Sequence, residues 1–124
     1  MQQKGLTDPD HTLISGGSNG GTVVAAVANQ RPDLFGVVIP RVAVTDMIRY
    51  QFFSGGHKWR EEYGISSEPD QIKNLMSYSP YHTVKPIRYP GIFLVTGDHD
   101  DRVPPLHTFK YLAQLQTIAG KVPN

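Results

Sequence analysis

A serine between glycines stands near the start of the chain, in the pentapeptide Gly16-Gly17-Ser18-Asn19-Gly20. The spacing Gly-x-Ser-x-Gly is typical of a tight turn that leads from a strand into a helix and exposes the serine hydroxyl as a nucleophile. We expect strained backbone angles at Ser18, and we expect Gly16 and Gly20 to be required because side chains there would collide across the turn. A helix beginning just after Ser18 would point free N–H groups at a developing oxyanion. The alternative is an ordinary turn serine, because glycine-rich turns are common.

A second polar group, Asp98-His99-Asp100-Asp101-Arg102, follows the apolar run of residues 90–97. One of its carboxylates could be the acid that a serine nucleophile needs behind its general base. Two other interpretations are open: a solvated loop with a local ion pair, and a metal site, although side chains adjacent in sequence seldom converge on one ion. His99 is interpreted as structural, because neighbouring side chains at a strand end diverge.

Apolar runs and helix signals alternate along the rest of the chain. Strands are expected over residues 11–15, 35–40 and 90–97, and helices over 21–30, from about 67 to 76, and 105–118. The last helix is predicted to bury a face made of Phe109, Leu112, Ala113 and Gln116 and to stop at Gly120. Strands separated by helices predict an α/β fold with a parallel sheet and flanking helices. Sites in such sheets lie at the carboxyl ends of strands, so Ser18 and Asp100 are expected on one rim.

Composition describes an ordinary globular chain of one domain at most. The 124 residues are 39% hydrophobic, with a net charge of +1 and no cysteine. This balance gives no reason to expect nucleic acid or an acidic membrane surface as a partner, and no apolar stretch reaches membrane-spanning length. The polar first ten residues lack the apolar centre of a signal peptide, and the absence of cysteine fits a reducing compartment; both favour the cytoplasm. No metal or organic cofactor is implied.

Several strings together identify a family resemblance that covers about residues 13–120. Residues 16–21, residues 29–36 (NQRPDLFG), residues 78–82 (YSPYH) and residues 98–103 (DHDDRV) resemble the catalytic domain of the prolyl oligopeptidases. That domain is an α/β-hydrolase, in which the serine precedes the acid in the chain, as it does here. The resemblance implies a serine endopeptidase that cleaves short proline-containing peptides after proline through an acyl-enzyme.

The resemblance also implies roles for individual residues. Ser18 is expected to be the nucleophile, Asp100 the acid of the triad, and the backbone N–H of Asn19 one oxyanion donor. Arg102 is expected to hydrogen-bond the substrate backbone. Alternatively, Arg102 could be a structural ion-pair partner of Asp98 or Asp101. Trp59 is expected to stack on the substrate proline, and the alternative is an ordinary core or surface aromatic. The same pocket is expected to be lined by Val103 and by Val44 and Tyr63, of which the last two could instead be plain core residues.

The chain departs from the family pattern in what it lacks. The family's catalytic histidine lies in a Gly-His-Gly context after a further strand, whereas only His107 follows Asp100 here, at a position that is non-catalytic in the family. The family's β-propeller and upstream oxyanion tyrosine have no counterpart either. We therefore expect residues 1–124 to form a partial α/β-hydrolase domain, incomplete at both ends, whose partner is the remainder of a parent enzyme. Three alternatives remain: an inactive truncated fragment, an interaction module on a hydrolase scaffold, and another hydrolase such as an acylaminoacyl peptidase or an esterase.

Overall fold

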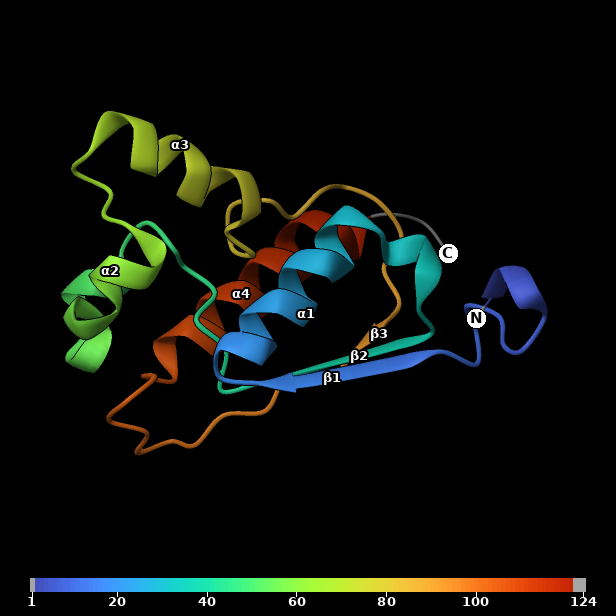
Figure 1. Cartoon of the computed structure of the whole chain (residues 1–124). Helices are drawn as coiled ribbons and strands as arrows, with labels where there is room; N and C mark the ends of the chain where they lie inside the picture. The colour runs from blue at the N-terminus through green and yellow to red at the C-terminus, as the bar shows by residue number, and fades with distance from the viewer. Residues whose placement is uncertain (1, 122–124) are drawn as a thin grey trace.

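A parallel sheet with the strand order β1-β2-β3 forms the base of the molecule (Figure 1). The computed structural model describes residues 2–121; Met1 and residues 122–124, which the predicted domain includes, lie outside the described residues. The strands are β1 (Leu13–Gly17), β2 (Val37–Arg41) and β3 (Gly91–Ile92). The fold class is α/β, as the alternation of strands and helices predicts.

The third strand is shorter than the predicted run over residues 90–97. Regular pairing ends after Ile92, yet the chain stays beside β2: Phe93 N donates to Val38 O at 3.0 Å and Val95 N donates to Pro40 O at 3.1 Å. Pro40 has no N–H to donate, so the ladder loses a hydrogen bond at this point. The chain path is therefore that of a longer strand, interrupted by a proline on its neighbour.

Helices α1 (Asn19–Gln30) and α4 (Leu106–Ile118) lie on the same face of the sheet (Figure 1). They meet in an apolar cluster in which Ala25 of α1 packs with Tyr111 and Leu115 of α4. Helix α1 begins directly after Ser18, two residues earlier than expected, and ends before Pro32, because the residue preceding a proline disfavours helical angles.

The predicted inner face of α4 is wrong. Phe109 and Leu112 are 58% and 40% exposed, and the buried positions are His107, Thr108, Tyr111 and Leu115. Apolar residues occur on both sides of this helix, so the periodicity of the sequence does not indicate which side is buried. The segments that pack against the helix determine it. The helix also runs on as a 3₁₀ turn over Ala119–Lys121, where a stop at Gly120 was expected.

Short helices fill the long connection between β2 and β3. They are η3 (Tyr50–Phe52), η4 (Ser54–Trp59), α2 (Arg60–Tyr63) and α3 (Pro69–Tyr78). The chain changes direction at Ser54, whose φ is 45°. Helix α3 starts at Pro69, where proline's fixed φ suits a first helical turn, and it runs to Tyr78, two residues past the expected end. These helices bring Trp59 and Tyr63 towards the carboxyl ends of the strands.

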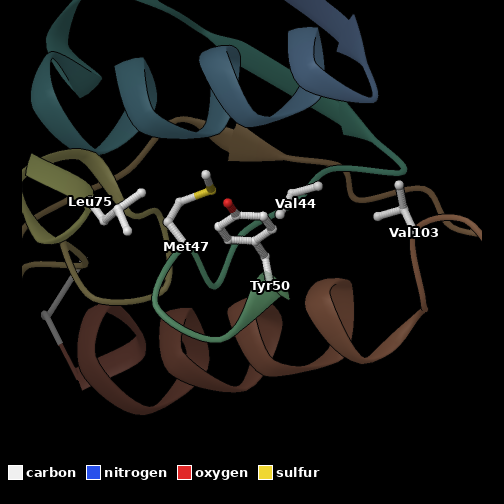
Figure 2. Close-up of a cluster of buried hydrophobic side chains, with 5 residues drawn as sticks. All are labelled: Val44, Met47, Tyr50, Leu75 and Val103. Carbon is white, nitrogen blue, oxygen red and sulfur yellow. The ribbon is translucent and has the colours of Figure 1, made fainter. Parts of the chain in front are cut away.

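A second apolar cluster lies under these short helices. It consists of Val44, Met47, Tyr50, Leu75 and Val103, with Trp59 and Tyr63 packed against it. In Figure 2, Met47 and Tyr50 lie side by side in the middle, with Leu75 at one end and Val103 at the other. Because the cluster joins the segment after β2 to the segment before α4, it holds together the parts of the chain that carry the candidate site.

The opposite face of the sheet is bare within residues 2–121. Ile92 and Leu94 pack against the cluster between α1 and α4, so Phe93 and Val95, which alternate with them, point to the opposite side. Leu13 points the same way, because it pairs in register with Val37, the neighbour of the buried Val38. The three side chains are 56% (Leu13), 64% (Phe93) and 37% (Val95) exposed, and in Figure 1 the helices lie on the other side of the sheet. Parallel sheets are normally covered on both faces, so this surface is unusually apolar for one that faces solvent. None of the helices in the described part is long and apolar enough to cross a membrane.

Candidate active site

Ser18 stands alone between β1 and α1, on a strained backbone. Its φ and ψ are 55° and −123°, a region that non-glycine residues rarely adopt, which confirms the strain expected of the turn. Its N–H donates to the carbonyl of Arg41 at 2.9 Å, and its carbonyl accepts the N–H of Thr22 at 3.1 Å. Within the described residues the Ser18 hydroxyl has no hydrogen-bond partner, so it is available to react.

The glycines around Ser18 are required at Gly16 and Gly21, and the prediction for Gly20 is wrong. A Cβ at Gly16 would lie 2.2 Å from the carbonyl oxygen of Gly20, and a Cβ at Gly21 would lie 2.7 Å from that of Arg41. A Cβ at Gly20 would meet no described atom within 4 Å. The backbone of Gly20 crowds Gly16, while the outward side of Gly20 faces open space.

One cavity of about 140 Å³ brings together most of the predicted site residues. Its walls are formed by Ser18, Asn19, Val44, Trp59, Glu62, Tyr63 and Arg102. These residues come from the first strand-helix turn, the segment after β2, the short helices and the loop before α4. A larger hollow of about 570 Å³ lies among residues 5–8 and His11, but neither Ser18 nor Asp100 lines it.

The aromatic side of the cavity is held rigidly. The rings of Tyr50 and Trp59 are stacked with centroids 6.4 Å apart, and the rings of Tyr50 and Tyr63 meet edge to face at 5.4 Å. Tyr50 is itself fully buried and donates its hydroxyl proton to the carbonyl of Gly64 at 2.6 Å. Trp59 is therefore supported from behind by a buried ring, which leaves its other side available to the cavity.

Tyr63 also contacts the residue that follows the serine. Its hydroxyl donates to Oδ1 of Asn19 at 2.7 Å, and Nδ2 of Asn19 lies 3.5 Å from a carboxylate oxygen of Glu62. Burial first, and then the nearby Glu62 carboxylate, raise the pKa of Tyr63 to about 12. The hydroxyl therefore keeps its proton at neutral pH and remains a donor to Asn19.

Asp100 and Val103 do not line the cavity. Asp100 is half-buried, and its Oδ1 accepts the N–H groups of Arg102 and Val103, both at 2.9 Å. Val103 is buried in the apolar cluster with Val44. The turn that Asp100 stabilises thus places Arg102 in the cavity and Val103 behind it. Asp100 follows the strand path of β3 as Ser18 follows β1, so both stand beyond the carboxyl ends of parallel strands.

Arg102 makes no ion pair among the described residues, so its alternative role as a partner of Asp98 or Asp101 receives no support. The side-chain pair described within residues 98–102 is that of His99 and Asp98, whose Nδ1 and Oδ1 atoms lie 3.0 Å apart on almost fully exposed side chains. Arg102 instead lines two hollows, because with Trp59 it also borders a second cavity of about 320 Å³ beside Gly55, Lys58 and Asp101.

No histidine of the described chain lines the Ser18 cavity. His107 lies inside α4 and is 1% exposed, with its Nδ1 accepting the backbone N–H of Asp46 at 3.3 Å. Burial lowers the pKa of His107 to about 4. It is therefore a neutral core residue, as its position in the sequence suggested. Nor do residues 2–121 contain a group of three His, Cys, Asp or Glu side chains placed to hold a metal ion.

Three residues near the site were not found from the sequence. Glu62 lines the cavity, Thr22 hydrogen-bonds Val44, and Val42 has a φ of 43°, which is strained for a β-branched side chain. Their signals are contacts between segments far apart in the chain. A glutamate beside an aromatic or a threonine in a helix looks ordinary in sequence.

Comparison with known proteins places this chain in a family. The chain matches the model of the prolyl oligopeptidase family (Peptidase_S9) over residues 1–122. It is 43% identical to a prolyl endopeptidase of Dictyostelium discoideum over 121 residues, which are 96% of this chain and 16% of that protein. It is 45% identical to a prolyl endopeptidase of Elizabethkingia miricola, covering 94% of this chain and 17% of that one.

Solved structures agree with the sequence comparison. Prolyl oligopeptidase B of Galerina marginata, bound to a 35mer hydrolysis and macrocyclization substrate, superposes with a TM-score of 0.88 at 33% identity, over 94% of this chain and 17% of that one. A prolyl endopeptidase structure superposes with a TM-score of 0.84 at 49% identity, over 86% of this chain and 16% of the other. The chain thus spans only a small part of the length of these relatives. With the family match extending over nearly every residue, the chain belongs to the prolyl oligopeptidase family.

Proposed function

We propose that this chain is part of a serine endopeptidase that cleaves short peptides after proline through an acyl-enzyme. The observation that carries the proposal is the single cavity shared by the strained Ser18 and by Val44, Trp59 and Tyr63. A proline side chain offers a flat apolar ring, and its nitrogen carries no N–H in a peptide. An aromatic face with apolar neighbours is the surface that recognises such a ring.

The proposed chemistry begins at Ser18. Its Oγ attacks the carbonyl carbon that follows the proline ring, and its proton passes to a general base. The negative charge develops on the carbonyl oxygen, where the N–H of Asn19 at the start of α1 can donate a hydrogen bond. The C–N bond then breaks as the leaving amine takes the proton, and water hydrolyses the resulting ester. Arg102 holds the substrate through a backbone carbonyl while this happens.

The acid and the base come from different places. Asp100 acts as the triad acid: Oδ1 is engaged by the turn, and Oδ2 is the oxygen that would orient an imidazole N–H. The base is a histidine from outside these 124 residues, because none of the described histidines lines the cavity. The remainder of a longer enzyme would also supply the second oxyanion donor and a β-propeller that limits substrate size. By themselves the 124 residues are therefore a non-catalytic portion.

The test compares this chain with a longer protein that carries it. With paired anilide substrates ending in proline or alanine, the longer protein should prefer proline, and Ser18→Ala should abolish turnover and labelling by a serine-directed fluorophosphonate. The 124-residue chain should show no measurable turnover, since loss of a triad member costs on the order of a millionfold. Preference for ester or acylamino substrates would contradict the proline assignment. Turnover by the short chain that disappears in His107→Ala would contradict the assignment of the base.

A further inference from the structure

Thr22 connects the nucleophile helix to the wall of the cavity. It is the fourth residue of α1, it is 3% exposed, and its backbone N–H donates to the carbonyl of Ser18. Its hydroxyl oxygen accepts the N–H of Val44 at 3.0 Å, and the hydroxyl donates to the carbonyl of the same residue at 2.9 Å. One side chain thus satisfies both backbone groups of Val44.

Val44 has need of this contact because it lies outside the sheet. Strand β2 ends at Arg41, and the following residue Val42 is strained at a φ of 43° while its N–H still reaches Val95. Two residues further, Val44 is 2% exposed, so its backbone groups cannot turn to water. The Thr22 hydroxyl makes the two hydrogen bonds that the backbone of a neighbouring strand would make to a residue inside a sheet.

Ser18 and Val44 lie at the two ends of a short chain of hydrogen bonds that runs through Thr22. Ser18 and Val44 both line the cavity, and the bonds from Ser18 to the Thr22 N–H and from the Thr22 hydroxyl to Val44 join them. A shift of Val44 would therefore change the room for a substrate ring relative to the attacking oxygen. Displacements of this kind affect rate as well as binding, because attack requires a close approach.

We propose that Thr22 is a positioning residue that sets the distance between the nucleophile and the Val44 wall, and so the fit of a proline ring. The inference rests on the proposed peptidase function. Thr22 touches no reacting atom and acts through Val44. Its hydroxyl is what matters, because valine has nearly the same shape but can neither accept from the N–H nor donate to the carbonyl.

The experiment compares Thr22→Val with Thr22→Ser, which restores the hydroxyl. Thr117→Val is the control, because the hydroxyl of Thr117 donates only to the carbonyl of Ala113 on the exposed side of α4. In the 124-residue chain, amide hydrogen exchange at Val44 should be faster by about tenfold in Thr22→Val and unchanged in the other two variants. In the longer protein, Thr22→Val should lower the ratio of kcat/KM for proline over alanine substrates by about fivefold or more, with a fall in kcat as well as a rise in KM. Should Thr22→Val not fold, Thr22→Ala removes the same hydroxyl with less bulk.

The outcomes separate this inference from the proposed function. Unchanged exchange at Val44, or an unchanged proline-to-alanine ratio in a protein that does prefer proline, overturns the role of Thr22 and leaves the peptidase assignment intact. Equal losses on both substrates also overturn it, because they mark a merely structural residue. A longer wild-type protein without proline preference overturns the proposed function itself, and the role of Thr22 in fitting proline with it.

Discussion

At the scale of single residues, the site depends on contacts that a side chain either makes or prevents. Ser18 is accessible because its position is strained and open, and Gly16 permits that strain by leaving room for the backbone of Gly20. Trp59 is held in place because the ring of Tyr50 stacks on it. These three features lie within or next to short sequence motifs, and they lead to two predictions.

Replacing Trp59 by alanine should reduce proline selectivity in the longer enzyme. The substitution removes the face on which a proline ring would stack, a loss of roughly 1–3 kcal/mol of apolar burial and ring contact. The ratio of kcat/KM for proline over alanine anilides should fall about five- to hundredfold. Trp59→Phe, which keeps an aromatic face, should retain part of the preference. Equal losses on the two substrates would make Trp59 a structural residue.

Gly16→Ala and Gly20→Ala are expected to change the free energy of unfolding in opposite directions. The added methyl at Gly16 meets the Gly20 carbonyl at 2.2 Å, so we expect a destabilisation of about 1–3 kcal/mol or more, as for other overpacked sites. The methyl at Gly20, the second residue of α1, meets no described atom within 4 Å, and alanine is favoured over glycine in a helix by up to roughly 1 kcal/mol. Urea denaturation of each variant measures both effects. Equal destabilisation by the two substitutions would refute the geometry of the turn.

At the scale of elements, α4 is attached to the segment after β2 by a buried polar group. Asp46 is fully buried, forms an ion pair with Lys110, and accepts the N–H groups of Ile48 and Arg49 at 3.2 Å. Burial, the largest single influence, raises the pKa of Asp46, but the hydrogen bond and charge of Lys110 together with the charges of His82 and Arg49 outweigh it, so the pKa lies below its ordinary value. His107 lies against the same segment. Its Nδ1 accepts a hydrogen bond from the N–H of Asp46, and its backbone carbonyl accepts one from the hydroxyl of Thr45.

The buried His107 predicts a loss of stability in acid. The unfolded chain protonates this histidine near pH 6.5, whereas burial holds the folded pKa at about 4, despite the opposing charge of Asp46. Between these values the unfolded state binds more protons, so the free energy of unfolding must fall as the pH falls, by up to about 3 kcal/mol in total. Above pH 6.5 this contribution is fully present.

Urea denaturation of the chain from pH 7 to 4 measures this slope. His107→Asn keeps a hydrogen-bond acceptor near Asp46 without a group that titrates in this range, and it should flatten the curve. His99→Asn, at a side chain that is 94% exposed, removes a histidine without removing a buried one and serves as the control. A slope that His107→Asn leaves unchanged would show that another group carries the acid sensitivity.

At the scale of the whole molecule, the bare sheet face dominates the behaviour expected of the chain in solution. Leu13, Phe93 and Val95 are exposed apolar residues on the side of the sheet away from α1 and α4. Exposed apolar surface of this kind drives association. We expect the 124-residue chain to self-associate at micromolar concentration, and Leu13→Thr with Phe93→Thr to reduce that association while preserving strand propensity.

Sedimentation velocity over a range of concentrations tests this expectation. Phe52→Thr is the matched control, because Phe52 is 69% exposed but lies in η3, off the sheet. The control should leave association unchanged. A monomeric wild-type chain, or an equal effect of Phe52→Thr, would show that the sheet face is not the surface responsible.

The sequence by itself determined the three strands, the three longer helices and the motifs, because these depend on residues close together in the chain. The apolar runs predicted the strands, Gly16-Gly17-Ser18 predicted the turn, and the strings around Ser18 and Asp100 identified the family. Only the tertiary structure decided which side of α4 is buried, that Gly21 is crowded and Gly20 is not, and that Pro40 interrupts the third strand. It also decided that Thr22 holds Val44 and that Glu62 enters the cavity. Each of these depends on atoms brought together from distant segments, and a local pattern carries no information about which segments will pack against each other.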